Sequence, residues 1–166
     1  MTTATNNASW EAELADLLNE LSTVQGEMLD VLQAKRECMA NRDLPGMSDL
    51  QATEIQIGDR LQACHDRRGA LLATARSAGV ECDTLGKLAK QLPAGKRETL
   101  GKQVDEAAIR TRLMQHESLT NWVVAQRTVL HLSQLIEIIA TGGRLQPTYG
   151  KNDAALARGA LVDQEA

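Results

Sequence analysis

The chain has 166 residues and a net charge of −4, and 43% of its residues are hydrophobic although only 2% are aromatic. This length fits one domain, the hydrophobic content excludes disorder throughout, and the acidic balance disfavours a nucleic-acid partner. With no Phe and only three prolines, the core must use Leu, Val, Ile, Met and Ala in long uninterrupted stretches, which favours helix over strand. We therefore predict an all-α fold.

The first long stretch combines an acidic surface with heptad spacing. Residues 1–34 hold six acids and no base, so this face is either solvated or docks a basic partner. Ser9 is a good N-cap, and we expect a helix over 10–41. Its apolar residues alternate at three and four positions, namely Leu14, Leu17, Leu21, Val24, Met28 and Val31. The start lacks the pattern of a signal peptide and no membrane span is expected, which indicates a cytoplasmic location without membrane insertion.

A second helix is expected to pair with the first in antiparallel fashion. Pro45 and Gly46 break the first helix, so the second begins at Gly46 or Ser48 and ends at Gly79 in a left-handed cap. Its seam includes charged interruptions and reads Leu50, Glu54, Ile57, Leu61, Cys64, Arg68, Leu71 and Ala75. A short helix over 84–91 follows, capped by Asp83 and ended by Pro93.

The longest periodic segment is expected to form a helix over 97–141. Its seam is small and polar in the middle, and a second apolar set lies beside it, which includes Val123, Val124 and Leu130. We predict an elongated antiparallel bundle of three long helices with one short helix and coiled-coil-like packing. The domain is expected to span 9–141, followed by a flexible C-terminal tail over 142–166.

No residue pattern points to catalysis, a metal or a cofactor. Cys64, His65 and Asp66 are adjacent on a helix, so their side chains point too far apart for a nucleophile–base chain. His116 and His131 lack the partners of a metal helix, and the glycines before Lys102 lack the spacing of a phosphate loop. Three cysteines without paired spacing are predicted to be reduced. The chain is not expected to be an enzyme, and contact with another protein is its expected function.

Two segments resemble the FlgN-type flagellar export chaperone family. The runs 114–116 and 119–124 (MQH and LTNWVV) look like the family's "LNxHNxxLL" region, and residues 147–153 (PTYGKND) are similar to its "TYGxDG" tail. The order of parts also agrees: a long acidic-faced helix, a turn, a second helix, and a last helix that ends in this tail. In this chain Asp153 stands one position later than in the family pattern, and the final Gly is absent.

The resemblance implies a cytoplasmic chaperone for flagellum biogenesis and type III protein export. Such a chaperone binds hook–filament junction (hook-associated) proteins, holds their terminal helices, and delivers them to the flagellar export gate. The family holds its substrate with the C-terminal part, and a tail tyrosine, here Tyr149, is implicated in docking to the gate. The substrate-binding residues expected here are Asn121, Trp122, Val123, Val124, Leu130 and Leu135.

A structural coiled-coil protein that only self-associates is the alternative. The same apolar stripes would then be covered by a second copy in a homodimer. Mass in solution with and without a partner helix separates the two functions.

Overall fold

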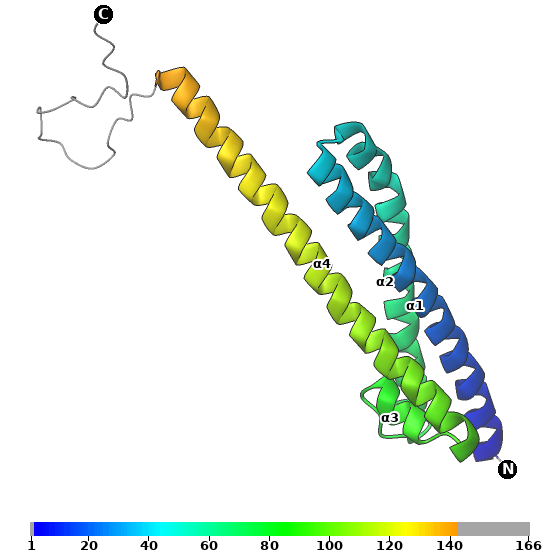
Figure 1. Ribbon diagram of the computed structural model, residues 1–166. Helices are drawn as coiled ribbons and strands as arrows, with labels where there is room; N and C mark the ends of the chain where they lie inside the picture. The colour runs from blue at the N-terminus through cyan, green and yellow to red at the C-terminus, as the bar shows by residue number, and fades with distance from the viewer. Residues whose placement is uncertain (1, 143–166) are drawn as a thin grey trace, which may run out of the picture. The chain divides into compact units, whose positions relative to one another are not determined.

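The computed structural model describes residues 2–142, which fold into four helices: α1 (Thr2–Asn41), α2 (Leu44–Ser77), α3 (Leu85–Lys90) and α4 (Ala94–Thr141) (Figure 1). No strand occurs among residues 2–142, and the helices hold more than two thirds of the chain. The predicted all-α fold is therefore confirmed. The chain divides into two compact units, Met1–Arg127 and Thr128–Ala166, and α4 contributes to both.

The boundaries of two long helices differ from the prediction. α1 begins at Thr2 and not after a cap at Ser9, because neither Pro nor Gly interrupts the residues before Trp10. α4 begins at Ala94 and not at Arg97, since the carbonyl oxygen of Pro93 accepts hydrogen bonds from the backbone N–H groups of Lys96 and Arg97 at 3.1 Å each. Pro93 therefore follows α3 and also accepts the first hydrogen bonds of α4.

The turn between α1 and α2 is tighter than predicted. Arg42 takes the left-handed conformation (φ 59°) after α1, and Asp43 then caps α2 by accepting a hydrogen bond from the Gly46 N–H at 2.9 Å. Pro45 does not break a helix here, because it lies in the first turn of α2, where its missing N–H is not needed. A Cβ atom on Gly46 would crowd the Asp43 carboxylate, so a larger residue here would displace the capping side chain.

α1 and α2 pair antiparallel along their predicted seams. Ile57 is buried in a cluster with Val24 and Val31, as predicted. Glu54, one of the two charged residues in the second seam, forms an ion pair with Lys35 of α1 at 2.8 Å. The antiparallel pairing of these two helices is thereby confirmed.

A larger core cluster lies at the other end of the hairpin, where α3 packs beside the start of α4 (Figure 1). Thr84, and not Asp83, caps α3, because its side chain accepts a hydrogen bond from the Lys87 N–H. Gly79 has a φ of 86° after α2, which confirms the predicted left-handed cap. The cluster draws on all four helices and comprises Trp10, Leu14, Leu17, Leu18, Cys64, Leu71, Leu72, Ala75, Cys82, Leu85, Leu88, Ala89, Leu92, Leu100 and Ala107.

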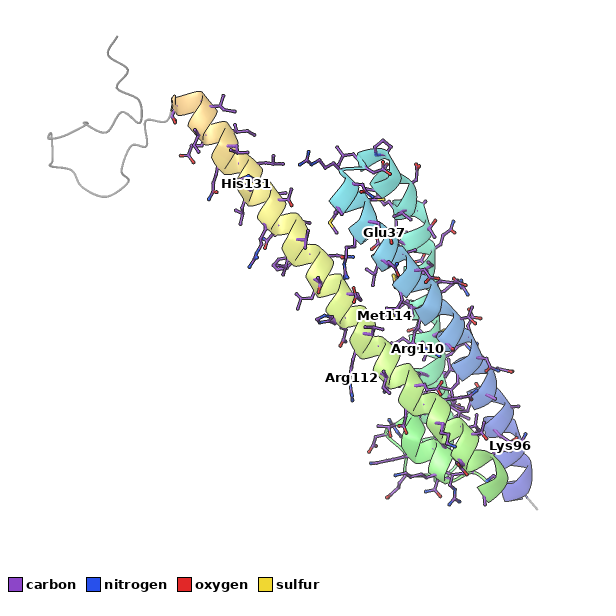
Figure 2. The ribbon with its side chains drawn as sticks, in the orientation of Figure 1. Glu37, Lys96, Arg110, Arg112, Met114 and His131 are labelled. Atoms are coloured by element: carbon purple, nitrogen blue, oxygen red, sulfur yellow. The ribbon has the colours of Figure 1, made fainter. Side chains whose placement is uncertain are left out.

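Within residues 1–127, α4 runs in the same direction as α1 and meets it through polar as well as apolar side chains. Gln25 donates to the Ala107 carbonyl oxygen at 3.0 Å, and Asn121 donates to the Leu32 carbonyl oxygen at 2.7 Å. Lys96 pairs with Glu11 on α1, Arg110 reaches Ser22 on α1, and Arg112 points away from both α1 and α2 (Figure 2). Hydrogen bonds therefore set the register of α4 on α1 as much as apolar packing does.

Candidate functional site

In residues 1–127, the four neighbouring residues that we expected to bind substrate divide between the interior and the surface. Asn121 is buried, and its side chain is engaged by the Leu32 carbonyl and by Arg36 Nε at 3.3 Å. Trp122 is 57% exposed, Val124 is also exposed, and Val123 is half-buried. Asn121 thus ties α4 to α1 in this structure, whereas Trp122 and Val124 are available on the surface for contact.

In the second unit, the helical residues 128–141 are exposed throughout. Leu130 is 60% exposed and Leu135 is 41% exposed, so both residues that we expected to bind substrate there lie on the surface. Tyr149, the expected gate contact, lies outside the described residues. The other exposed large apolar residues of this helical stretch are Val129, Leu132, Ile136, Ile138 and Ile139.

This density of exposed apolar side chains needs a cover. Monomeric soluble proteins rarely expose contiguous apolar patches of more than a few hundred Å², and larger patches mark interaction sites. Helices with such faces commonly dock other helices, with anchor residues spaced at three and four positions. The end of α4 therefore has the chemistry of a helix-docking surface.

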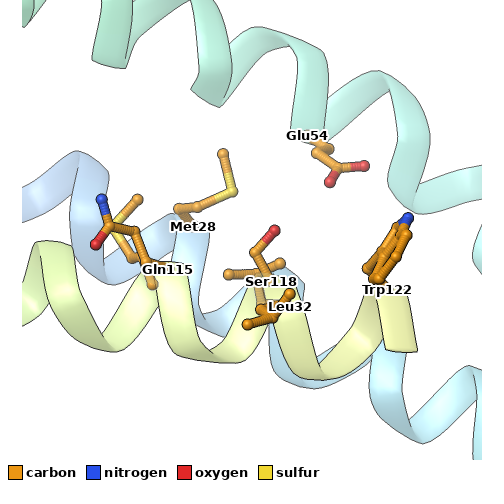
Figure 3. Close-up of a pocket in the computed structure, with 8 residues that line it drawn as sticks. Met28, Leu32, Glu54, Gln115, Ser118 and Trp122 are labelled. Carbon is orange, nitrogen blue, oxygen red and sulfur yellow. The ribbon is translucent and has the colours of Figure 1, made fainter. Parts of the chain in front are cut away.

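An open groove, not predicted from the sequence, lies between α2 and α4 within residues 1–127. Its first cavity, of about 300 Å³, begins at Leu85 of α3 and is lined by Gln25, His65 and Arg68, among others. Its second cavity, of about 560 Å³, is lined by Met28 and Leu32 of α1, Glu54 of α2, and Ser118 and Trp122 of α4 (Figure 3). Met114 lines both cavities, so we treat them as one feature, the α2/α4 groove.

The side chains that line the second cavity come from three helices, α1, α2 and α4. Glu54 projects from α2 near Trp122 of α4, and Met28 and Leu32 of α1 lie farther along the groove, near Gln115 and Ser118 of α4 (Figure 3). Ser118 and Trp122 are four residues apart and therefore share one face of α4. The groove is apolar along its floor and carries polar groups at intervals.

Ion pairs hold the α1/α2 hairpin that forms one wall. Arg60 Nη2 lies 3.0 Å from Glu20 Oε1, Arg60 also pairs with Glu27, and hydrogen bonds to Glu20 and then Glu27 raise the pKa of Arg60. Because Glu11 pairs with Lys96, three of the six acids in residues 1–34 are engaged within the protein. The acidic surface of α1 is thus in part an internal bonding face.

Within residues 2–142, the three cysteines are free and form no metal-binding group with the histidines. Cys38, Cys64 and Cys82 are free thiols, and burial raises the pKa of Cys64. Cys64 is buried and the adjacent His65 is exposed, and both line the first cavity of the α2/α4 groove. The described residues hold no group of three or more His, Cys, Asp or Glu that could bind a metal ion.

The sequence pattern of one protein family, described as FlgN protein, matches residues 1–156. The chain therefore belongs to the FlgN family, whose members are flagellar export chaperones, and the resemblance drawn from its residues is confirmed. Neither the curated proteins nor the solved structures that were compared include a match to the chain. Among the described helices, none is long and apolar enough to cross a membrane.

Proposed function

We propose that this protein is a cytoplasmic export chaperone that binds hook–filament junction proteins and delivers them to the flagellar type III export gate. Membership of the FlgN family gives the general class. The observation that carries the finer proposal is the row of exposed apolar side chains near the end of α4. A chaperone of this kind needs contact surface and no catalytic group.

The cargo-binding residues in this proposal are the exposed Trp122 and Val124 of the first unit and Leu130 and Leu135 of the second. Val123 and Asn121 belong to the predicted set as well, and the burial of Asn121 gives it a helix-packing contact in the free protein. The cargo segment would be a terminal helix whose apolar face is aggregation-prone in solution. Covering that face against α4 removes apolar area from water on both partners.

A charge placed in the surface tests the cargo part of the proposal. Leu130→Asp should weaken binding of a purified junction protein at least tenfold, because the new carboxylate would have to be desolvated at the contact. Gln51→Asp adds the same charge at an exposed position of α2 and serves as the matched control, with binding within twofold of wild type. Calorimetric titration of the full chain measures both, and equal binding by wild type and Leu130→Asp would contradict this assignment.

The export-gate part of the proposal falls on Tyr149. An aromatic side chain in a polar segment is suited to act as an anchor in a partner's pocket. Tyr149→Ala should lose affinity for the purified gate component while it keeps its helix content and its cargo binding. Loss of cargo binding with gate binding unchanged would refute the separation of the two roles.

A further inference from the structure

The α2/α4 groove is partly filled by the protein's own short helix. Leu85, Leu88 and Leu92 of the α3 region are buried against α2 and α4 at positions i, i+3 and i+7. Leu85 also lines the first cavity of the open part, so the filled and open parts adjoin. The protein itself therefore shows what kind of segment fits between α2 and α4: a short helix with leucines on one face.

Gln25 lines the first cavity of the groove, and its side chain holds a buried hydrogen-bond acceptor that is not used. The side chain is 1% exposed, and its Nε2 donates to the Ala107 carbonyl at 3.0 Å and to Thr111 Oγ1 at 2.9 Å. The Thr111 hydroxyl donates to the Ala107 carbonyl, so its oxygen must accept from Gln25, which fixes the orientation of the amide. Gln25 Oε1 is buried and has no hydrogen-bond partner among the described residues.

We propose that the open part of the α2/α4 groove is a cargo site for one amphipathic helix that carries a hydrogen-bond donor side chain opposite Gln25. This inference rests on the proposed function and adds a second contact surface to it. The occupant would present apolar residues at positions i, i+3 or i+4, and i+7 to Met28, Leu32 and Met114. An amide, hydroxyl or ammonium group on the same face would donate to Gln25 Oε1, because an unpaired buried acceptor costs free energy.

The length of the site sets the length of its occupant. Thr111 and Trp122 are eleven residues apart on α4, which corresponds to about 16 Å at 1.5 Å per residue. The occupant is therefore a helical segment of about three turns. One end of this segment would lie next to Leu85 of α3.

The charges along the groove favour one direction of the bound helix. Arg68 and His65 lie at the end next to α3, whereas Glu54 lies at the other end. Lys35 offsets the Glu54 charge through its 2.8 Å ion pair, so Arg68 makes the stronger contribution. A helix C-terminus carries partial negative charge and is stabilised beside a cation, so the bound helix would run parallel to α2, with its C-terminal end toward Arg68.

Two substitutions on the full chain test the site against a synthetic peptide that spans the terminal helix of a hook–filament junction protein. Ser118→Trp fills the second cavity from an exposed position, and should lower peptide affinity at least tenfold. His116→Trp adds the same ring on α4 at an exposed position that does not line the groove, and should bind within twofold of wild type. Gln25→Met keeps the side-chain length but removes the acceptor, and should lower affinity about tenfold.

The readout uses the two tryptophans. For the chain without an added tryptophan and for Gln25→Met, a Trp10→Phe background leaves Trp122 as the sole indole, and its emission should shift to shorter wavelength when the peptide covers it. Calorimetric titration gives the affinities of Ser118→Trp and His116→Trp. Replacing the peptide's donor residue by an apolar one should weaken binding to wild type and have no effect on Gln25→Met. Circular dichroism melting of each variant checks that the fold is kept, because Gln25→Met also removes the Nε2 hydrogen bonds to Ala107 and Thr111 that join α1 to α4.

The outcomes separate this site from the general function. If Leu130→Asp weakens peptide binding while Ser118→Trp and Gln25→Met bind like wild type, the groove site is refuted and the chaperone proposal stands. If wild type does not bind the peptide at all, both are refuted. If wild type is a dimer that Ser118→Trp converts to a monomer without change in peptide affinity, the occupant is a second copy and the cargo site is wrong.

Discussion

The same two helices, α2 and α4, bound both ends of the α2/α4 groove, but α3 fills one end and the other end is open. At one end α3 places Leu85, Leu88 and Leu92 against the core, and these side chains are at least 92% buried. At the other end the same two helices leave cavities, and Leu119 and Trp122 remain more than half exposed. One pair of helices thus carries both a completed core and an uncovered surface.

This difference separates stability from binding within one short protein. Buried leucines stabilise a fold in proportion to the apolar area they remove from water. Apolar side chains that stay exposed in the folded state contribute little to the free energy of unfolding, and their area becomes available when a partner covers them. Substitutions at the filled end should therefore change stability, and substitutions at the open end should change affinity.

The largest effect on stability is expected at the filled end. Leu88→Ala should lower the free energy of unfolding by about 2–5 kcal/mol, because the side chain is fully buried and a cavity would remain. Leu119→Ala, at the open end, should change it by no more than about 0.5 kcal/mol. Urea unfolding of both variants measures the contrast, and similar losses would show that the two ends do not differ.

Asn121 should show an intermediate effect, because it is the buried polar link between α4 and α1. Asn121→Ala removes the donor to the Leu32 carbonyl and should cost about 1–3 kcal/mol of unfolding free energy. Ser118→Ala, three residues earlier and exposed, is the control and should be near neutral. A neutral Asn121→Ala with reduced cargo affinity would instead favour a direct cargo contact at this position.

The cap of α3 should have a smaller effect. Thr84→Ala removes the acceptor for the Lys87 N–H and should cost about 1 kcal/mol. Thermal unfolding should report a modest decrease in midpoint for this variant. Thr84→Ser retains a hydroxyl acceptor and should unfold close to wild type, and a loss as large as that of Thr84→Ala would mean that the cap does not act through its oxygen.

The smallest effect is expected for the surface pair Asp83–Lys87. A hydrogen bond from Lys87 at 2.7 Å lowers the pKa of Asp83. The charged carboxylate therefore stabilises the fold at pH values above the ordinary pKa of Asp. This contribution is lost as the pH falls through the lowered pKa of Asp83. Lys87→Met should return the Asp83 pKa toward its usual range, as NMR titration of the side-chain carboxyl would show. Because both groups are exposed, added salt should weaken the shift. An unchanged pKa in Lys87→Met would show that another group causes it.

The hairpin could be predicted from the sequence because its seam follows a single heptad pattern. Val24, Val31 and Ile57 stand at seam positions and are buried together, and Lys35 and Glu54 stand opposite each other. Leu21 stands on the same seam and is only half-buried, since it borders the groove. Periodicity identified the helices but did not show how far each side chain is buried.

The second face of α1 could not be predicted from the same pattern. Leu18, Gln25 and Leu32 lie one position beside the seam and are buried, because α1 contacts α4 as well as α2. A polar Gln25 gave no signal of burial, since its partners Ala107 and Thr111 are more than 80 residues away in the chain. The α2/α4 groove depends on how far these helices separate, which spacing along the chain does not specify.

The exposed surface at the end of α4 was predicted from its excess of apolar residues. Trp122, Val124, Leu130 and Leu135 are exposed as a binding surface requires, and their contact with cargo stays a prediction. Asn121 belonged to the same run of residues, and its burial shows that adjacent helix positions can serve packing and surface separately.

Light scattering of the purified full chain, alone and mixed with a purified hook–filament junction protein, tests the central claim most directly. A chaperone should form a complex of defined stoichiometry with the junction protein, and Leu130→Asp should reduce its amount while Gln51→Asp should not. A chain that self-associates equally with and without the junction protein, and never forms a mixed complex, would contradict the account and support the structural coiled-coil alternative.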